Sequence, residues 1–337
     1  MIQAVLLFIV GIICLIKGGD WFVDSSTAIA KRFHVPEILI GATVVSIGTT
    51  LPEVMVSATS AVIGHGEIAY GNAIGSVICN TALISAITIA IRPSSVNGKE
   101  LKVPVAFFFV AAAFYCVCSY ALKGFPRWCG LVLLSMFIIY IALQVKDALG
   151  KMKNKTVKES EDEEEDQPMW KVLFFFVIGA ALIAIGADLL VDNGTIIAQS
   201  LGVPESVIAL TFVALGTSLP ELVTAITSLA KGHSALSVGN IVGANLFNLV
   251  LVSGVSVTLS PFALPSSKTI GGMNASLVLD IPLMLFVMAF MTIPAIVKNK
   301  LSRFQGIILL IVYFSFCIFQ FVYFIEKIGR AVILSPF

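Results

Sequence analysis

Two six-residue segments in apolar parts of the chain carry polar groups that seldom occur in such surroundings. Residues 48–53 read GTTLPE and residues 216–221 read GTSLPE. In each segment a glutamate directly follows a proline, which lacks an N–H group and whose ring crowds the carbonyl four residues earlier. That carbonyl loses its helical partner. Each segment therefore offers a carboxylate, hydroxyl oxygens and an unpaired carbonyl oxygen.

Ligands of this kind favour hard cations. Oxygen donors without Cys or His suit calcium or sodium and do not suit zinc or copper. A charged side chain at the middle of a bilayer costs about 3 kcal/mol on insertion scales. Two carboxylates that face each other also repel, so we expect a cation between Glu53 and Glu221. The alternative is a helix kink with two protonated glutamates, but it does not explain why the whole hexamer occurs twice.

A second pair of segments, residues 71–80 and 239–248, adds amide and hydroxyl groups. Asn80 and Asn248 occupy matching positions, and Ser76 lies one helical turn before Asn80, on the same face. The residue that matches Ser76 is Ala244, which has no hydroxyl group. Glycines spaced four apart in both segments allow close helix packing. We expect Ser76, Asn80 and Asn248 to face the glutamates.

The composition requires a membrane protein around these segments. Apolar residues make up 58% of the 337 residues and charged residues only 12%, and 13 of the 41 charged residues lie within residues 146–166. A soluble protein with so few charges could not cover its surface. The composition excludes a cytosolic enzyme. The net charge of +1 says nothing about nucleic acid, but the sequence has no basic patch dense enough to bind it, so we expect no nucleic-acid partner.

Apolar runs of about 20 residues can cross a bilayer as helices. They are continuous and do not alternate with period two, which excludes barrel strands. The sequence predicts ten spans, at residues 2–29, 37–63, 68–92, 103–121, 127–146, 169–196, 204–230, 235–260, 276–296 and 304–325.

The chain matches itself when it is shifted by 168 residues. Residues 35–80 and 203–248 are identical at 19 of 46 positions. Each half holds five spans, and because five is odd the second half enters the membrane from the opposite side. The predicted fold is an all-α membrane protein of two inverted five-helix repeats with broken second and seventh helices. The domains are a first repeat (1–146), an acidic connector (147–168) and a second repeat (169–337).

Lysine and arginine in the loops predict the orientation. The loops after the odd-numbered spans hold 14 of these residues and the opposite side holds 5. The positive-inside rule therefore places both termini outside and the connector in the cytoplasm, most simply in the plasma (cytoplasmic) membrane. The acidic run 159–166 fits a solvated linker, because like charges repel and stay disordered. The other interpretation is a weak calcium-sensing tract.

The two hexamers resemble the repeated motifs of the sodium/calcium exchangers in the cation/calcium exchanger superfamily, of prokaryotic type, and the ten spans resemble that family's plan. The resemblance implies that Glu53 and Glu221 bind calcium with the backbone carbonyls of Thr49 and Thr217. It also implies that the first and sixth helices slide across the rest to expose the site to each side in turn. The side chains that it implies for sodium sites are those of Thr50, Ser218, Ser76 and Asn80.

Two residues depart from the family pattern. Ala244 stands where serine is usual and removes an oxygen, and Asn248 stands where aspartate is common. The site then has two carboxylates, whose charge one calcium or two sodium ions would balance. Sodium/calcium antiport is the predicted function, with transported ions and the bilayer as partners and no cofactor. Nothing in the pattern specifies an oligomeric state.

Three other functions remain open at this point. The closest is calcium/proton antiport through the same glutamates. An ion channel also fits inverted repeats and broken helices. An intramembrane aspartyl protease based on Asp20 or Asp24 leaves the paired glutamates unexplained and lacks a G-x-G-D motif.

Overall fold

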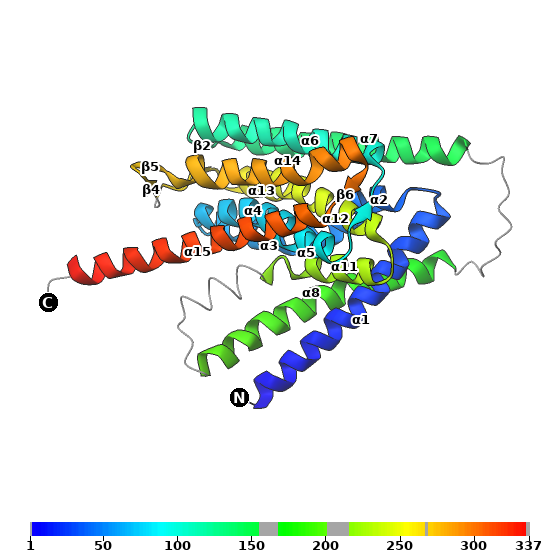
Figure 1. Cartoon of the computed structure of the whole chain (residues 1–337), viewed down its shortest axis with the longest axis horizontal. Coiled ribbons are helices and arrows are strands. Elements are labelled where there is room, and N and C mark those ends of the chain that lie inside the picture. The colour runs from blue at the N-terminus through cyan, green and yellow to red at the C-terminus, as the bar shows by residue number, and fades with distance from the viewer. Residues whose placement is uncertain (1, 155–167, 201–215, 267–268, 335–337) are drawn as a thin grey trace.

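The computed structural model describes residues 2–154, 168–200, 216–266 and 269–334, which form a bundle of long helices (Figure 1). Among the described residues, nine helices are long and apolar enough to cross a membrane. The remaining predicted span, 204–230, is represented by the shorter apolar helix α11 (Leu219–Ala230), because residues 201–215 lie outside the described residues. The all-α membrane fold predicted from the sequence is confirmed.

The first five spans follow one another along residues 2–154, and three of them contain wider π-helical turns, labelled η. Their elements are α1 (Ile2–Arg32), α2 (Glu37–Ile40), η1 (Gly41–Val45), α3 (Ser46–Val62), α4 (Gly66–Cys79), η2 (Asn80–Ser85), α5 (Ala86–Ile91), α6 (Gly98–Cys116), η3 (Val117–Ala121) and α7 (Arg127–Asn154).

The second five spans repeat this order. Besides α11 their elements are α8 (Met169–Ser200), α12 (Ser234–Phe247), η5 (Asn248–Val252), α13 (Ser253–Leu259), η6 (Ser276–Asp280), α14 (Ile281–Lys298) and α15 (Arg303–Leu334). Helix α7 is longer than the predicted fifth span, and the acidic run 159–166 lies outside the described residues.

The break predicted in the second span takes another form. The helical assignment runs without interruption from Glu37 to Val62, with Pro52 inside α3. The distortion is the π-helical turn η1, about two turns before the proline. Side chains satisfy carbonyls of this turn, because the Ser46 hydroxyl donates to Gly41 O at 2.6 Å and the Tyr140 hydroxyl donates to Ala42 O at 2.9 Å. Neighbouring side chains therefore allow an irregular helix at this depth.

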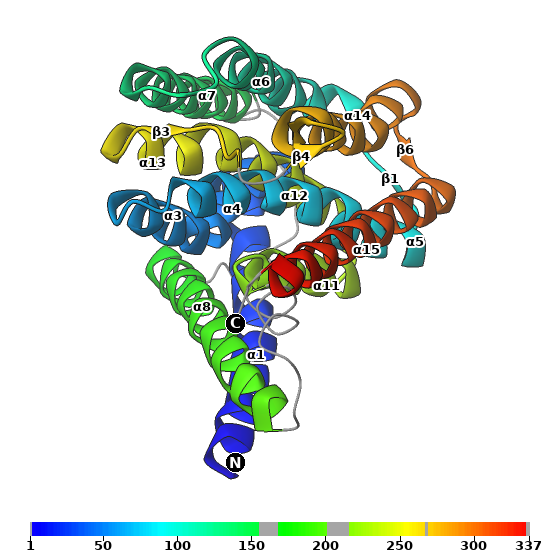
Figure 2. The same ribbon diagram turned by 90° about the vertical axis from the view of Figure 1, so that its left-hand side faces the viewer.

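Helices α1 and α8 form a pair beside the rest of the bundle, and Figure 2 shows them together at one edge. Glycines let their backbones touch. A Cβ atom added at Gly18 would lie 2.8 Å from Gly179 O, and one added at Gly186 would lie 2.8 Å from Gly11 O. A shift of 168 residues relates Gly11 to Gly179 and Gly18 to Gly186. The crossing is thus made by matching residues of the two repeats, as small-residue contacts in membranes are.

Short strands join loops of the two repeats at opposite ends of the bundle. Strand β1 (Ser94–Ser95) pairs with β6 (Lys300–Leu301), and both follow odd-numbered spans. Strand β2 (Gly124–Phe125) pairs with β3 (Phe262–Ala263), and both follow even-numbered spans. A further hairpin joins β4 (Thr269–Ile270) and β5 (Met273–Asn274). Loops that the repeat places on one side of the membrane therefore lie together.

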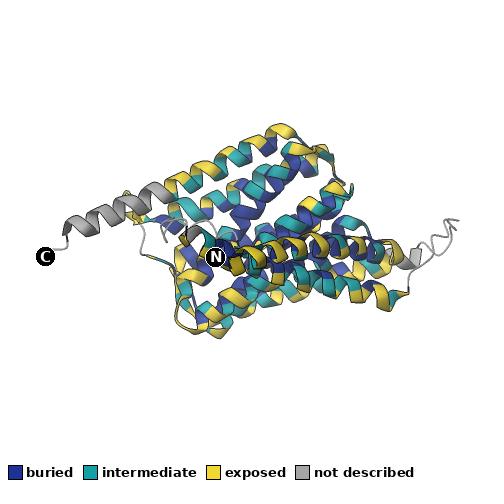
Figure 3. Ribbon diagram, turned by 90° about the horizontal axis from the view of Figure 1, so that it is seen from below, coloured by how far each residue is buried: buried dark blue, intermediate teal, exposed yellow. Residues whose placement is uncertain are grey.

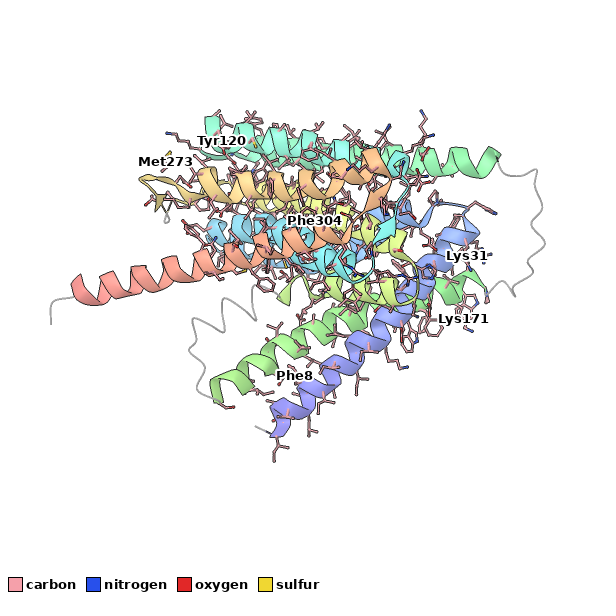
Figure 4. The ribbon with its side chains drawn as sticks, in the orientation of Figure 1. Phe8, Lys31, Tyr120, Lys171, Met273 and Phe304 are labelled. Atoms are coloured by element: carbon pink, nitrogen blue, oxygen red, sulfur yellow. The ribbon has the colours of Figure 1, made fainter. Side chains whose placement is uncertain are left out.

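The side chains labelled in Figure 4 agree with this separation of the loops. Lys31 and Lys171 lie at one end of the bundle, and Tyr120 and Met273 lie at the other. Lys31 ends the first span and Lys171 begins the sixth, so both are expected on the side that holds more lysine and arginine. Segments that the repeat places on one side of the membrane thus lie at one end of the bundle.

The outer surface of the bundle is apolar, as lipid contact requires. Exposed residues line the outer faces of the helices in Figure 3, and buried residues face inward. Ile138 on α7 is 65% exposed and Phe314 on α15 is 55% exposed. Among the described spans the most enclosed is Ser234–Leu259, made of α12, η5 and α13, with 83% of its most apolar stretch buried. The polar residues singled out above lie on α3, α4, η2 and η5, on α11 and just before it.

Candidate ion-binding site

Glu53 and Glu221 lie at the centre of the bundle, on α3 and α11. Both side chains are fully buried, and all four carboxylate oxygens lack a hydrogen-bond partner among the described residues. The two carboxylates are close enough to repel each other. A buried ionised carboxylate without a partner is highly unfavourable, so this pair needs a cation or protons. The arrangement is that expected from the hexamers.

Hydroxyl groups surround the carboxylates. Thr50 precedes Glu53 by three residues, and Ser218 holds the matching place before Glu221. Both are buried, and both hydroxyl groups have no hydrogen-bond partner among the described residues. A buried hydroxyl group that stays unpaired destabilises the folded protein by about 1–3 kcal/mol. Their burial beside two carboxylates gives the centre of the protein an unusual density of unpaired oxygen atoms.

The third span of each repeat contributes amides. Asn80 and Asn248 begin the turns η2 and η5, and both are fully buried. Neither amide has a partner for its oxygen or nitrogen among the described residues. Ser76 is 4% exposed, and Ala244 is fully buried at the matching position. Six of the nine predicted ligand residues thus carry unpaired buried polar atoms.

The two remaining hexamer residues use their hydroxyl groups for other contacts. Thr49 donates to Asn240 Oδ1 at 3.2 Å, and Thr217 donates to Asn72 Oδ1 at 3.1 Å. The resemblance implied only their carbonyls as ligands, and these contacts involve their side chains. The sequence predicted no role for Asn72 or Asn240. Their identity at matching positions was the only signal in the sequence.

Further polar residues extend the polar lining beyond the prediction. Thr224 and Ser228 follow Glu221 on α11, and both are buried with unpaired hydroxyl groups in the described structure. Asn245 donates to Thr81 Oγ1 at 2.7 Å and so connects α12 to η2. Asn245 has no counterpart in the first repeat, where the matching residue is valine, so self-similarity did not indicate it.

A small cavity separates the hexamers from the α1–α8 pair. Its volume is about 10 Å³, and its lining residues are Phe22, Gly48, Thr49, Pro52, Ala180, Ile183, Ala184 and Pro220. Phe22 of α1 is fully buried and lies 3.2 Å from a Cβ atom built at Gly48. A shift of α1 and α8 would therefore change the enclosure of the hexamers directly.

Charged residues at one end of the bundle connect α1 to the second repeat. Lys231, just after α11, pairs with Asp24 at 2.8 Å and with Asp20 at 3.2 Å. Burial alone would lower the pKa of Lys231, but hydrogen bonds and charge from Asp24 and Asp20 raise it above its usual value. His233 Nδ1 lies 2.9 Å from Glu37 Oε1. Asp20 and Asp24 of the first repeat thus contact a lysine of the second.

The comparison with protein families identifies the class of this chain. A family described as sodium/calcium exchanger protein matches residues 3–146 and 171–322. The chain belongs to the sodium/calcium exchanger family. Membership of the family makes it a sodium/calcium antiporter of the membrane.

Similar proteins cover the full length of the chain. An uncharacterized membrane protein of Methanocaldococcus jannaschii is 33% identical over 91% of this chain and 94% of its own length. Sodium/calcium exchanger MaX1 of Methanosarcina acetivorans is 26% identical over 94% and 98% of the two chains. A solved structure of the sodium-calcium exchanger NCX_Mj superposes with a TM-score of 0.75 at 32% identity, over 94% of this chain and 97% of that one. The resemblance stated from the hexamers is confirmed.

Proposed function

We propose that this exchanger moves sodium and calcium in opposite directions through one central site built around Glu53 and Glu221. The observation that carries this proposal is the pair of fully buried glutamates, one from each repeat, whose four carboxylate oxygens have no partner among the described residues. Such a pair is stable when a cation lies between the carboxylates. The family assignment names the transported ions.

The remaining ligands follow from the surroundings of the glutamates. For calcium we propose the two carboxylates together with the carbonyl oxygens of Thr49 and Thr217. Calcium takes six to eight oxygen ligands, and this set offers up to six when both carboxylates bind through two oxygens. For sodium we propose the neutral oxygens of Thr50, Ser218, Ser76, Asn80 and Asn248.

The charge of the site supports exchange of one calcium for sodium. Two carboxylates carry two negative charges, and Asn248 adds none where an aspartate would add a third. One calcium ion or two sodium ions would leave the site neutral. A third sodium ion would leave a net positive charge in a medium of low polarity, which is unfavourable. We therefore propose that two sodium ions at most bind close to the carboxylates.

Alternating access is proposed to depend on the α1–α8 pair. The glycine contacts between these helices bring the backbones close together. Phe22 of α1 closes the cavity beside Gly48 and Thr49. A shift of the pair along the bundle would open this region toward one end and then toward the other. The ion pairs of Lys231 would hold α1 in one of these positions.

We propose the cytoplasmic membrane as the location, with both termini outside and the segment between α7 and α8 in the cytoplasm. The proposed division is that of the repeats, at residues 1–146, 147–168 and 169–337. Labelling of single cysteines tests the orientation on a background without the six native cysteines. A reagent added from outside should reach a cysteine at the exposed position His65 and should not reach one at Ser160. Labelling of the cysteine at 160 from outside contradicts the orientation.

Calcium uptake into vesicles containing the purified protein tests the coupling. Sodium, potassium and proton gradients are imposed separately, with a protonophore present in the sodium experiment. We expect uptake whenever sodium leaves the vesicles, and none with a proton gradient alone. Uptake driven by protons without sodium would replace the proposal by calcium/proton antiport. Currents far above transporter turnover would indicate a channel.

A further inference from the structure

Two asparagines in the third span of each repeat make matching contacts with the hexamer of the opposite repeat. Asn72 lies on α4 and Asn240 on α12, and a shift of 168 residues relates them. Asn240 is fully buried and Asn72 is half-buried. Neither is among the proposed ion ligands, so the reason for their burial at the centre of the bundle lies elsewhere.

Each asparagine accepts a hydrogen bond from the threonine at the second position of a hexamer. The Thr49 hydroxyl of the first repeat donates to Asn240 Oδ1 of the second at 3.2 Å. The Thr217 hydroxyl of the second repeat donates to Asn72 Oδ1 of the first at 3.1 Å. The partners are 191 and 145 residues apart in the chain. The same contact therefore occurs twice, each time between the repeats.

Each asparagine also contacts its surroundings at a second point. The Asn72 amide nitrogen donates to Ser57 Oγ at 2.8 Å and to Glu53 O at 3.3 Å. Asn72 thus connects the turn that carries Glu53 with Thr217 of the other hexamer. The Ser46 hydroxyl, whose shortest contact is with Gly41 O at 2.6 Å, also lies 3.0 Å from the Asn240 backbone oxygen and 3.3 Å from Asn240 Oδ1. Asn240 thus holds α3 at two points.

A hydroxyl group held in this way restricts the backbone of its own residue. The threonine oxygen is separated from its carbonyl carbon by only two atoms, and χ1 of a β-branched residue is already stiff. Fixing the hydroxyl on a neighbouring helix therefore fixes the orientation of the threonine backbone relative to the other repeat. Residues that orient a metal ligand in this manner are worth 10- to 100-fold in metal affinity.

We propose that Asn72 and Asn240 are positioning residues for calcium. Asn240 orients the carbonyl of Thr49, and Asn72 orients the carbonyl of Thr217. The asparagines touch no ion themselves. This inference rests on the proposed function, because it takes those two carbonyls as calcium ligands. It also gives the pseudo-symmetry a mechanical purpose, since each repeat sets the geometry of the ligands that the other repeat supplies.

Double-mutant cycles test the proposal. Thr49→Val removes the hydroxyl at nearly constant shape, and Asn240→Leu removes the amide. Calcium dissociation constants are measured in detergent, and calcium KM and kcat in vesicles. Each single change should weaken calcium binding about tenfold. The double variant should be no weaker than either single variant, because both remove the same contact.

The crossed pair serves as the control. Thr49→Val combined with Asn72→Leu breaks two separate contacts, so their effects on calcium binding should multiply. If the effects on calcium binding multiply in the Thr49–Asn240 pair as they do in the Thr49–Asn72 pair, the proposal is overturned. If Asn240→Leu gives no folded protein, the cycle of Thr217→Val with Asn72→Leu decides, since Asn72 is only half-buried. A change in thermal stability that leaves calcium binding unaltered indicates a packing role and also overturns the proposal.

A parallel measurement separates this inference from the function on which it rests. Glu53→Gln is assayed for calcium transport in the same vesicles. Transport at the original rate by Glu53→Gln contradicts the proposed site itself. If Glu53→Gln loses transport, the proposed site is retained. If the effects of the Thr49 and Asn240 changes are then additive, the positioning role is rejected.

Discussion

In the first repeat, Ser57 lies one turn after Glu53, and its hydroxyl accepts a hydrogen bond from the Asn72 amide at 2.8 Å. In the second repeat the residue matching Ser57 is Ala225, and the Asn240 amide nitrogen is buried without a partner among the described residues. Ser76 and Ala244 differ in the same way. The first repeat thus has hydroxyl groups at two positions where the second has methyl groups.

At the bundle end the difference is reversed. Lys231 follows the seventh span and pairs with Asp20 and Asp24 of α1, whereas its counterpart after the second span is Ile63. The hexamers themselves are almost identical. The comparison indicates that symmetry is retained where both repeats contribute ligands to one ion. Symmetry is lost where only one repeat makes the contact, such as a sodium ligand in one repeat or an ion pair at one membrane surface.

The largest expected effect lies where the repeats are equal. Glu53→Gln and Glu221→Gln each remove one charge from the site at constant volume. Breaking one partner of a buried ionic site costs about 3–5 kcal/mol, so calcium transport should fall below detection in both variants. Transport is measured as uptake of radioactive calcium into vesicles, after purification shows folded protein. Asp147→Asn, at an exposed position near the end of α7, should behave as the original protein.

A difference between the two glutamate variants would break the equality of the repeats. If Glu221→Gln retains calcium exchange while Glu53→Gln loses it, the second hexamer does not share the calcium ion. In that case the proposed site contracts to the first repeat, and the self-similarity of the hexamers has another origin.

The next effect concerns the hydroxyl group beside each asparagine. Ser57→Ala would leave the Asn72 nitrogen without its shortest hydrogen bond and should destabilise the protein by about 1–3 kcal/mol. Ala225→Ser would supply the matching oxygen to Asn240 and should stabilise it by about 1 kcal/mol. Thermal unfolding in detergent measures both. A loss of stability in Ala225→Ser would show that the second repeat has no space for the contact.

A smaller effect is expected at the bundle end. Lys231→Gln removes partly exposed ion pairs, which contribute about 1 kcal/mol at most. If these pairs hold α1 in one position, the ratio of calcium affinities measured from the two sides should change by about fivefold. The matching change is Ile63→Lys, because the repeat relates Ile63 to Lys231, and Asp188 and Asp192 to Asp20 and Asp24. It should move the ratio of calcium affinities in the opposite direction. Changes in the same direction would contradict a role for symmetry here.

The dependence of this ion pair on pH has a definite sign. The pKa of Lys231 is raised, so its contribution to stability is complete below the ordinary lysine value and is lost only as the pH rises through the higher folded value. The ratio of calcium affinities from the two sides should therefore differ between the original protein and Lys231→Gln. That difference should stay constant between pH 7 and pH 9.

The sequence predicted the spans, the repeat and the buried glutamates, because apolar length, self-similarity and the presence of carboxylates are local properties. It did not predict the contacts of Thr49 with Asn240 or of Lys231 with Asp24, which join residues about 200 positions apart. The sequence also did not indicate where the second span is distorted, since a proline permits several distortions. The π-helical turn before Pro52 depends on Tyr140 and Ser46, and no local pattern indicates their positions.

The smallest expected effect sharpens the comparison at positions 76 and 244. Both residues are buried one turn before an asparagine that we propose as a sodium ligand. Ser76 offers a hydroxyl group and Ala244 does not. A single neutral oxygen contributes little to an alkali ion, about 1 kcal/mol or less. Ala244→Ser should therefore strengthen sodium binding by about threefold and leave calcium affinity nearly unchanged, and Ser76→Ala should weaken sodium binding to a similar degree.

The sodium concentration that half-inhibits calcium binding in detergent measures this difference. If Ala244→Ser leaves that concentration unchanged while Ser76→Ala raises it strongly, sodium binds beside the first repeat alone. The two repeats would then share calcium but not sodium, since calcium needs both carboxylates and sodium needs only one set of neutral oxygens. If neither change has an effect, the neutral oxygens at these positions do not bind sodium, and coupling through protonation of the glutamates becomes the better explanation.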